Sequence, residues 1–362
     1  MEEYDDEFDV CPHCGFAEGT EQENALHMMP GSILEERYIV GKVIGYGGFG
    51  VTYIGWDCLL ETKVAIKEYL PSEFSTRVIG QTEVTVFSGD KQEQFADGLR
   101  KFTDEAKKLA KYHSLNGIVK IFDSIETNNT AYIIMELLEG ETLAEMLKRE
   151  ERFSENKTME MMIPIIESLD LIHNDGIIHR DIAPDNIFVT TSGEVKLIDF
   201  GAARYATTTH SRSLTVIIKP GYSPEEQYRS RGDQGPHTDV YAVAATMYKM
   251  LTGVTPPDAL ERRALFENKK KDILDPIRKH CKEIGESREN AILNALNVRI
   301  EDRTPDMKEF MAELTSVEPV KRRAGNIKKI DLYKWPVWAK IAFPVITAAL
   351  IVFNVLFIMG IN

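Results

Sequence analysis

The sequence has few cysteines and a deficit of positive charge. Its 4 cysteines in 362 residues, at positions 11, 14, 58 and 281, are too few and too scattered for a disulfide framework. We therefore expect the folded part in a reducing cytosol. The 43 lysines and arginines are outnumbered by 57 aspartates and glutamates, and the net charge is -14. Because a phosphate backbone binds to a basic face, nucleic acid is not expected as a partner. The first ten residues are acidic and lack an apolar core, so we expect no cleavable signal peptide.

One long apolar run is present. Residues 341–361, IAFPVITAALIVFNVLFIMGI, carry no charge, and a helix of this length at about 1.5 Å per residue spans a hydrocarbon core of roughly 30 Å. Trp335 and Trp338 lie where interfacial aromatic residues belong, and the basic stretch KRRAGNIKK precedes them. We expect a single-pass plasma-membrane helix whose N-terminal side faces the cytoplasm. The alternative is a buried core helix.

The rest of the sequence divides into a strand-rich half and a helix-rich half. Residues 38–87 are rich in valine, isoleucine, tyrosine and threonine with glycine punctuation, which predicts a small antiparallel sheet. Residues 92–113 carry apolar side chains at three- and four-residue spacing, which is typical of an amphipathic helix. Two strand-like runs follow, and beyond Thr142 the pattern is mostly helical. We expect an α+β fold of two lobes with a cleft between them.

A glycine cluster in the strand-rich half is the first candidate for phosphate binding. GYGGFGV runs from Gly45 to Val51, and such clusters between strands are more often tight turns than nucleotide clamps. VAIK follows, and its Lys67 can place a point charge on phosphates that lie under a hairpin without obstructing side chains. Lys67 requires a carboxylate to hold it. Glu105 is the natural candidate, and Asp104 and Glu93 remain open.

Three polar side chains in the helix-rich half complete the pattern. HRDIAPDN supplies Asp181, which can orient an accepting hydroxyl and take its proton, and Asn186, which can bind a metal ion. LIDFG supplies Asp199 as a second and stronger Mg²⁺ ligand. Phosphoryl transfer depends on positioning and on neutralisation of charge, which hard oxygen ligands and Mg²⁺ provide. His179 alone could be a core histidine and Asp199 a turn residue, but their joint occurrence in this order favours a phosphotransfer site.

These motifs closely resemble the eukaryotic-like protein kinase superfamily over about residues 36–315. VAIKEYLPSEFSTR, KPGYSPEEQY and LTGVTPPDA are especially similar to bacterial membrane-anchored serine/threonine kinases. The resemblance implies the bilobal kinase fold, with ATP and Mg²⁺ in the cleft. The resulting domains are an acidic extension at 1–30, a β-rich N-lobe and hinge at 36–138, a helical C-lobe at 139–315, a basic juxtamembrane linker at 316–340 and the membrane helix at 341–361.

The resemblance also implies roles for residues around the cleft. Met135 should be the gatekeeper ahead of the hinge at 136–138, and Asp239 should brace the catalytic loop. Glu226, or Glu225 with a one-residue shift, should form a structural ion pair with Arg303. The segment 71–92 is longer than in many kinases and is interpreted as an insertion of unknown purpose. The residues implied in nucleotide binding are Gly45, Gly47, Gly48, Gly50, Val51, Ala65, Lys67, Glu105, Met135, Glu136 and Leu138.

Two positions depart from the usual serine/threonine kinase pattern. Ala183 stands where a lysine is usual, and Lys219 of KPGY stands where a threonine normally contacts the catalytic aspartate. We hypothesise that the lysine has been relocated, so that Lys219 neutralises the γ-phosphate from the other wall of the site. Lys219 is then a fifth catalytic residue beside Lys67, Asp181, Asn186 and Asp199. The alternative is a surface lysine in a loop.

Hydroxyl groups are frequent between Arg204 and Lys219. They belong to Thr207, Thr208, Thr209, Ser211, Ser213 and Thr215. In an activation segment, a phosphate on one of them could pair with Arg180 and order the loop. We expect autophosphorylation there, although such hydroxyls are common in any loop.

CPHCG near the N-terminus has the spacing of a zinc knuckle. Cys11 and Cys14 can occupy two positions of a tetrahedral Zn²⁺ site, but a structural site requires four ligands and no second CxxC is present. The motif resembles half of the zinc ribbon found ahead of some bacterial kinases. The alternatives are a site completed by a second molecule and a knuckle without metal.

The leading interpretation is a membrane-anchored enzyme that transfers phosphate from ATP to serine or threonine hydroxyls of proteins. The membrane segment would tether the chain and support homodimers. A pseudokinase scaffold that binds nucleotide and partners is the first alternative, although Lys67, Asp181 and Asp199 are all present. A small-molecule kinase is the second, and the long segment ending in GYSPEEQY disfavours it because that segment suits a polypeptide substrate.

Overall fold

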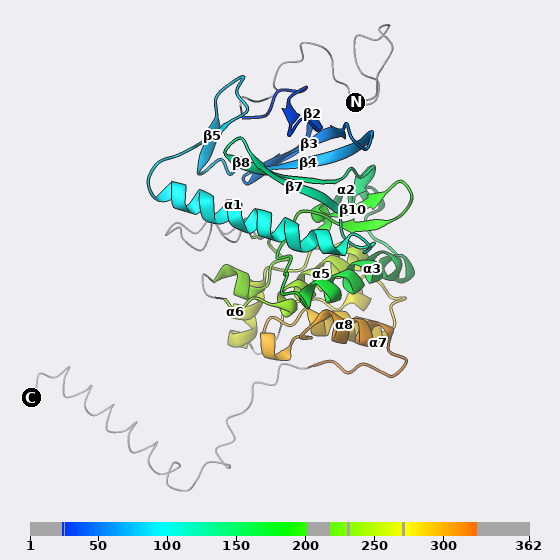
Figure 1. Cartoon of the computed structure of the whole chain (residues 1–362). Helices are drawn as coiled ribbons and strands as arrows, with labels where there is room; N and C mark the ends of the chain where they lie inside the picture. The colour runs from blue at the N-terminus through cyan, green and yellow to red at the C-terminus, as the bar shows by residue number, and fades with distance from the viewer. Residues whose placement is uncertain (1–23, 25, 201–217, 230–231, 270–271, 324–362) are drawn as a thin grey trace, which may run out of the picture. The chain divides into compact units, whose positions relative to one another are not determined.

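The computed structural model describes residues 24, 26–200, 218–229, 232–269 and 272–323 (Figure 1). A strand-rich half precedes a helix-rich half, as the sequence pattern predicted. Within these residues, no helix has the length and apolar character needed to cross a membrane. The apolar run 341–361, most of the linker 316–340 and the CPHCG motif lie outside the described residues.

The strand-rich half is built on a six-stranded antiparallel sheet in the order β1-β2-β3-β4-β8-β7. Its strands are β1 (Ile33–Leu34), β2 (Tyr38–Gly47), β3 (Gly50–Asp57), β4 (Thr62–Tyr69), β7 (Ile121–Thr127) and β8 (Thr130–Glu136). Side chains of β3 alternate between buried and half-buried, as expected for a strand with one face on the core. Met28, within the predicted N-terminal extension, is buried in the same core.

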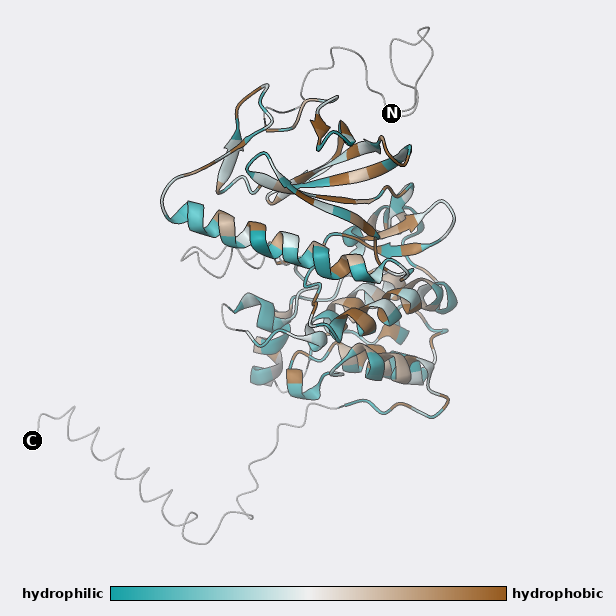
Figure 2. Ribbon diagram, viewed as in Figure 1, coloured by the Kyte–Doolittle hydropathy of each residue, from teal (hydrophilic) through white to brown (hydrophobic). Residues whose placement is uncertain are grey.

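Helix α1 (Asp90–Leu109) packs on β7 and β8 and carries its apolar stripe toward the sheet (Figures 1 and 2). The predicted spacing is confirmed, since Phe95, Phe102, Ala106 and Leu109 are all buried. Glu105 is buried on the same helix, whereas Asp104 and Glu93 are exposed. Of the three candidate carboxylates, Glu105 is thus the buried one, while Lys67 Nζ pairs with Asp199 at 2.7 Å. The role of Glu105 in holding Lys67 stays a prediction.

The insertion between Pro71 and Gln92 forms a separate hairpin of β5 (Ser75–Arg77) and β6 (Val84–Val86). Arg77 from this hairpin is buried against Glu68 of β4, and its Nη1 lies 3.1 Å from Glu68 Oε2. Arg77 also donates to the carbonyl of Leu26 at 2.7 Å. Tyr53 donates to Glu68 Oε2 at 2.8 Å, and burial raises the pKa of Tyr53, so that its hydroxyl stays protonated. The insertion thus attaches the N-terminal segment to the sheet beside Lys67.

The helix-rich half surrounds the nearly fully buried helix α5. The helices are α2 (Leu143–Glu150), α3 (Glu155–His173), α5 (Pro236–Thr252), α6 (Ala259–Lys269), α7 (Glu286–Ala295) and α8 (Met307–Thr315). Three short strands form a separate sheet: β9 (Gly140–Thr142), β10 (Ile187–Thr190) and β11 (Val195–Leu197). Helices α3, α7 and α8 pack around α5, and a helix buried on most sides must be apolar on most of its surface.

A buried ion pair attaches the segment GYSPEEQY to this half. Arg303 Nη1 lies 2.6 Å from Glu226 Oε1, and both side chains are buried. Glu225 instead pairs with Arg263 at 2.8 Å. Of the two alternatives left open by the sequence, Glu226 is the partner of Arg303.

Candidate active site

The glycine-rich segment forms the hairpin between β2 and β3, in which Gly47 pairs with Gly50. A Cβ on Gly50 would lie 2.1 Å from the carbonyl oxygen of Glu68, so the fold itself requires glycine there. At Gly45, Gly47 and Gly48 a Cβ would meet nothing within 4 Å. Packing does not explain these three glycines. A ligand that lies against the hairpin backbone would explain them, because glycine lets it approach closely.

Lys67 extends from β4 into the region under this hairpin. Its Nζ lies 2.7 Å from Asp199 Oδ1, which brings together two residues that are 132 positions apart in the sequence. A hollow of about 200 Å³ is lined by Lys67, Asp199 and the hairpin residues Gly45, Gly47 and Gly50. Glu105 lines an adjoining cavity together with Lys67 and Asp199. The ammonium and both carboxylates therefore share one region.

The loop HRDIAPDN is folded so that Asn186 contacts Asp181. The turn η2 (Pro184–Asn186) brings the amide back, and Asn186 Nδ2 donates to Asp181 Oδ2 at 2.7 Å and to its backbone carbonyl at 2.7 Å. The backbone N–H of Ile198 donates to the carbonyl of Asn186 at 2.9 Å, which positions the adjacent Asp199. The side chains of Asp181 and Asn186 and the backbone before Asp199 are thereby held together.

The buried carboxylate of Asp239 binds the backbone of the loop HRDIAPDN. It accepts hydrogen bonds from the backbone N–H groups of His179 at 2.8 Å and Arg180 at 2.9 Å, and His173 Nε2 lies 2.8 Å away. Burial opposes the charge of Asp239, but the hydrogen bonds from His173 and from the backbone hold its pKa below the ordinary value. The backbone of Arg180 has a φ of 65°, a strained conformation that the hydrogen bond to Asp239 helps to maintain.

His179 packs inside the site as a neutral imidazole. Its Nδ1 accepts from the N–H of Asp181 at 3.2 Å, so Nε2 is the nitrogen that donates to the carbonyl of Ile198 at 3.0 Å. Burial lowers the pKa of His179, which is consistent with this neutral tautomer. The ring also contacts Phe200, with centroids 4.4 Å apart. His179 therefore connects the catalytic loop to the segment that carries Asp199.

The remaining predicted cleft residues lie on adjacent strands. Ala65 of β4 pairs with Met135 of β8, and Val51 is buried on β3. Glu136 Oε1 accepts from Lys196 Nζ at 2.9 Å and from the N–H of Lys120 at 2.8 Å. The Glu136 side chain thus braces the junction between the two halves. Leu138 follows it as a half-buried residue.

Lys219 lies beside the catalytic loop. Its Nζ is 3.2 Å from Asp181 Oδ1 and 2.8 Å from Asp185 Oδ2. The contact with Asp181 is the arrangement that the relocation hypothesis requires. The contact with Asp185 was not predicted, because the sequence shows only that an aspartate lies four residues after Asp181.

Two predictions concern residues outside the described part of the chain. The six hydroxyl residues between Thr207 and Thr215 and the pair Cys11 and Cys14 are not described, and both predictions stay predictions. Within the described residues no cluster of three or more histidine, cysteine, aspartate or glutamate side chains could hold a metal ion.

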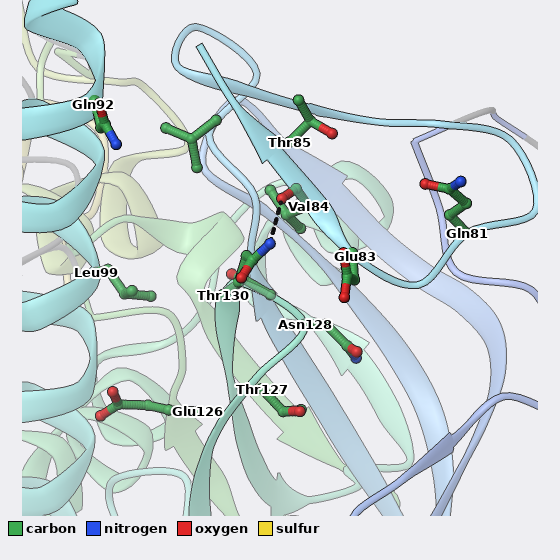
Figure 3. A pocket seen from close by; sticks show the side chains of 12 residues that line it. Gln81, Glu83, Val84, Thr85, Gln92, Leu99, Glu126, Thr127, Asn128 and Thr130 are labelled. Carbon is green, nitrogen blue, oxygen red and sulfur yellow. Dashed lines mark hydrogen bonds between the residues drawn. The ribbon is translucent and has the colours of Figure 1, made fainter. Parts of the chain in front are cut away.

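A larger hollow of about 790 Å³ lies away from these residues, between β6, the start of α1 and the β7–β8 turn (Figure 3). Amides, hydroxyls and the carboxylates of Glu83 and Glu126 line it, and Asn129 Nδ2 donates to the carbonyl of Val84 at 3.4 Å across it. None of its lining residues is a lysine or arginine. Since phosphates require positive charge, the hollow beside Lys67 suits a nucleotide and this one does not.

Comparison with known proteins gives a consistent result. A family model described as protein kinase domain matches residues 38–335. A probable serine/threonine-protein kinase of Clostridium acetobutylicum is 30% identical over 292 residues, which cover 80% of this chain and 41% of that protein. The serine/threonine-protein kinase PknL of Mycobacterium tuberculosis is 32% identical over 226 residues, covering 62% of this chain and 51% of PknL.

A solved structure agrees with the sequence matches. The structure titled PpkA-294 apo form is 29% identical, has a TM-score of 0.70 and covers 80% of this chain and 99% of that chain. This chain spans about half the length of the curated relatives it matches.

Proposed function

This chain belongs to the protein kinase family, and on that premise we propose that it transfers the γ-phosphate of ATP to serine and threonine hydroxyls of proteins. One observation carries the proposal. Lys67 and Asp199 meet in the hollow under the glycine hairpin, and Asn186, which contacts Asp181, accepts a backbone hydrogen bond from Ile198, the residue before Asp199. Positioning and charge are most of what phosphoryl transfer requires from a protein.

Each side chain has a role that its contacts support. Lys67 is held by Asp199 and carries the charge for the nucleotide phosphates. Asp181 is fixed by Asn186 and by the braced loop, so its carboxylate can orient the accepting hydroxyl and take its proton. The buried pair Glu226–Arg303 fixes the segment KPGYSPEEQY, which begins at Lys219 and beside which a polypeptide substrate would lie.

Mg²⁺ fits the donor set of Asn186 and Asp199. Both hydrogen bonds of the Asn186 amide to Asp181 use Nδ2, which leaves the oxygen Oδ1 as a hard ligand. The carboxylate of Asp199 is half-buried and supplies the second hard oxygen ligand. When bound, Mg²⁺ supplies positive charge to the phosphate oxygens.

The test is transfer of radiolabelled phosphate from ATP to a generic protein substrate. Asp199→Asn should reduce transfer by at least about 10²-fold, because it removes charge at the phosphates. Asp104→Asn is the matched control, since Asp104 is an exposed aspartate on α1 and should leave transfer unchanged. Nucleotide binding without transfer to any substrate would favour the pseudokinase scaffold, and transfer to small molecules alone would favour the second alternative.

We also propose autophosphorylation of the hydroxyl residues between Thr207 and Thr215. The support is their number in a segment that precedes Lys219, together with Arg180 in the catalytic loop. Mass spectrometry should find phosphate on this segment in the parent protein and none in Asp181→Asn. Phosphate at the same sites in both proteins, each purified from cells without other protein kinases, would contradict the proposal.

Membrane anchoring by residues 341–361 is a further part of the proposed function. It rests on the charge-free run, the flanking Trp335 and Trp338 and the basic residues before them, with the kinase domain on the cytoplasmic side. Such a segment would also support homodimers. Fractionation of cells should place the full chain in the membrane and a chain that ends at residue 323 in the soluble fraction. Equal distribution of both would contradict anchoring.

A further inference from the structure

The ammonium of Lys219 lies between two carboxylates at the edge of the site. Its Nζ contacts Asp181 Oδ1 at 3.2 Å and Asp185 Oδ2 at 2.8 Å. The backbone around it is fixed as well, because the N–H of Lys219 donates to Ser223 Oγ at 3.1 Å and its carbonyl accepts from the N–H of Ser223 at 2.9 Å. The side chain is only 20% exposed. These contacts do not fit a solvated surface lysine.

The ammonium of Lys219 affects the charge balance at Asp181. A phosphoryl group that approaches a hydroxyl held by Asp181 brings negative charge toward a carboxylate that is itself buried. Lys67, the other ammonium of the site, is engaged by Asp199 on the nucleotide side. Lys219 is the ammonium that the structure places directly against Asp181, where it can offset this repulsion.

We propose that Lys219 is a catalytic residue that binds the γ-phosphate during transfer, an inference that rests on the proposed protein kinase function. The hydroxyl oxygen of the substrate forms a bond to phosphorus while the bond to the β-phosphate oxygen breaks and ADP leaves. The hydroxyl proton moves to Asp181. Lys219 contacts the oxygens of the transferred group, where preorganised charge stabilises the transition state.

Asp185 is the positioning residue for this lysine. Its carboxylate is 58% exposed, so the pair Lys219–Asp185 is weakened by solvent and can be exchanged for a phosphate. Ala183 lies in the same loop and is fully buried. Its methyl group carries no charge, and so the ammonium beside Asp181 comes from Lys219 on a different segment.

The first experiment compares the full-length parent protein with Lys219→Met. Turnover should fall about 10²- to 10³-fold. Binding should change selectively: affinity for a non-hydrolysable ATP analogue should fall, whereas affinity for ADP, which has no γ-phosphate, should stay within about twofold. Lys157→Met is the matched control, because Lys157 also forms an ion pair at 2.7 Å, with Glu150, outside the site. Asp185→Asn should lower turnover by about fivefold at most, since an exposed ion pair contributes little.

The second experiment moves the charge. Lys219→Thr should lose turnover like Lys219→Met, and adding Ala183→Lys to it should restore at least about tenfold, because an ammonium is then supplied to the site from the catalytic loop. Denaturant unfolding of each variant identifies loss of turnover that reflects misfolding.

The possible results separate this inference from the proposed function. An inactive parent would refute the kinase proposal itself. An active parent with equally active Lys219→Met would refute the role of Lys219 alone. A more active Lys219→Met would also refute it, since it would show that the lysine masks Asp181 instead of assisting transfer. Equal losses of ATP-analogue and ADP affinity would overturn the contact with the γ-phosphate.

Discussion

Replacing Arg77 by methionine should strongly destabilise the strand-rich half. The guanidinium group contacts both oxygens of Glu68 and donates to the carbonyls of Leu26 at 2.7 Å and Thr82 at 3.1 Å. The side chains of Arg77 and Glu68 are both 0% exposed. Methionine fills a similar volume but leaves the Glu68 carboxylate buried without its cation. Breaking a buried pair in this way costs about 3–5 kcal/mol.

Urea unfolding followed by circular dichroism measures this cost as a lower midpoint at constant slope. Arg149→Met is the control, because Arg149 forms a two-point pair with Glu141 at 2.8 Å but is 59% exposed, and its loss should lower the midpoint much less than Arg77→Met does. Changing Glu68 to leucine together with Arg77→Met should recover part of the loss, because no charge is then left buried. A cost below about 1 kcal/mol for Arg77→Met would refute the buried-pair explanation of the insertion.

Three further predictions follow from the site and its supports. Glu226→Gln should lower the free energy of urea unfolding by about 3–5 kcal/mol, because Arg303 then stays buried without a carboxylate. Glu225→Gln should lower it much less, and equal losses would contradict the pairing of Glu226 with Arg303. Because burial holds the pKa of His179 below 6.5 in the folded protein, the unfolded chain takes up this proton first as the pH falls. The free energy of unfolding should therefore decrease below about pH 6.5, by up to about 1.4 kcal/mol per pH unit. His179→Asn should flatten this slope, and an unchanged slope would contradict the assignment of the pH dependence to His179. Gly47→Val should raise the KM for ATP and change the unfolding free energy by less than about 0.5 kcal/mol. Gly50→Ala should cost about 1–3 kcal/mol, since its Cβ would lie 2.1 Å from the Glu68 carbonyl; the reverse order of stabilities would refute the assignment of the glycines.

Local motifs predicted most of the candidate site. HRDIAPDN and LIDFG each hold their functional residues within a few positions, so local folding alone places Asn186 against Asp181. The amphipathic spacing of residues 92–113 likewise predicted helix α1, because burial of one face repeats every three or four residues. Patterns of this kind act over one turn or one strand and can be read without knowledge of the rest of the chain.

Contacts between distant segments could not be predicted in this way. Arg77 ends the stretch VAIKEYLPSEFSTR, but the motif assigned it no partner, and only the position of β5 buries it against Glu68. Asp185 had no predicted role, and its contact with Lys219 depends on where the KPGY segment lies in space. No periodicity in the sequence encodes either contact.

The sequence by itself determined which chemical groups the candidate site has: one strand lysine, two aspartates, an asparagine and the lysine of KPGY. Only the tertiary structure decided which carboxylate faces which cation. It pairs Lys67 with Asp199, Lys219 with Asp181 and Asp185, and Arg303 with Glu226 instead of its neighbour Glu225. The physical reason is that an ion pair depends on a separation of a few ångströms in space, whereas a sequence pattern fixes a position only along the chain.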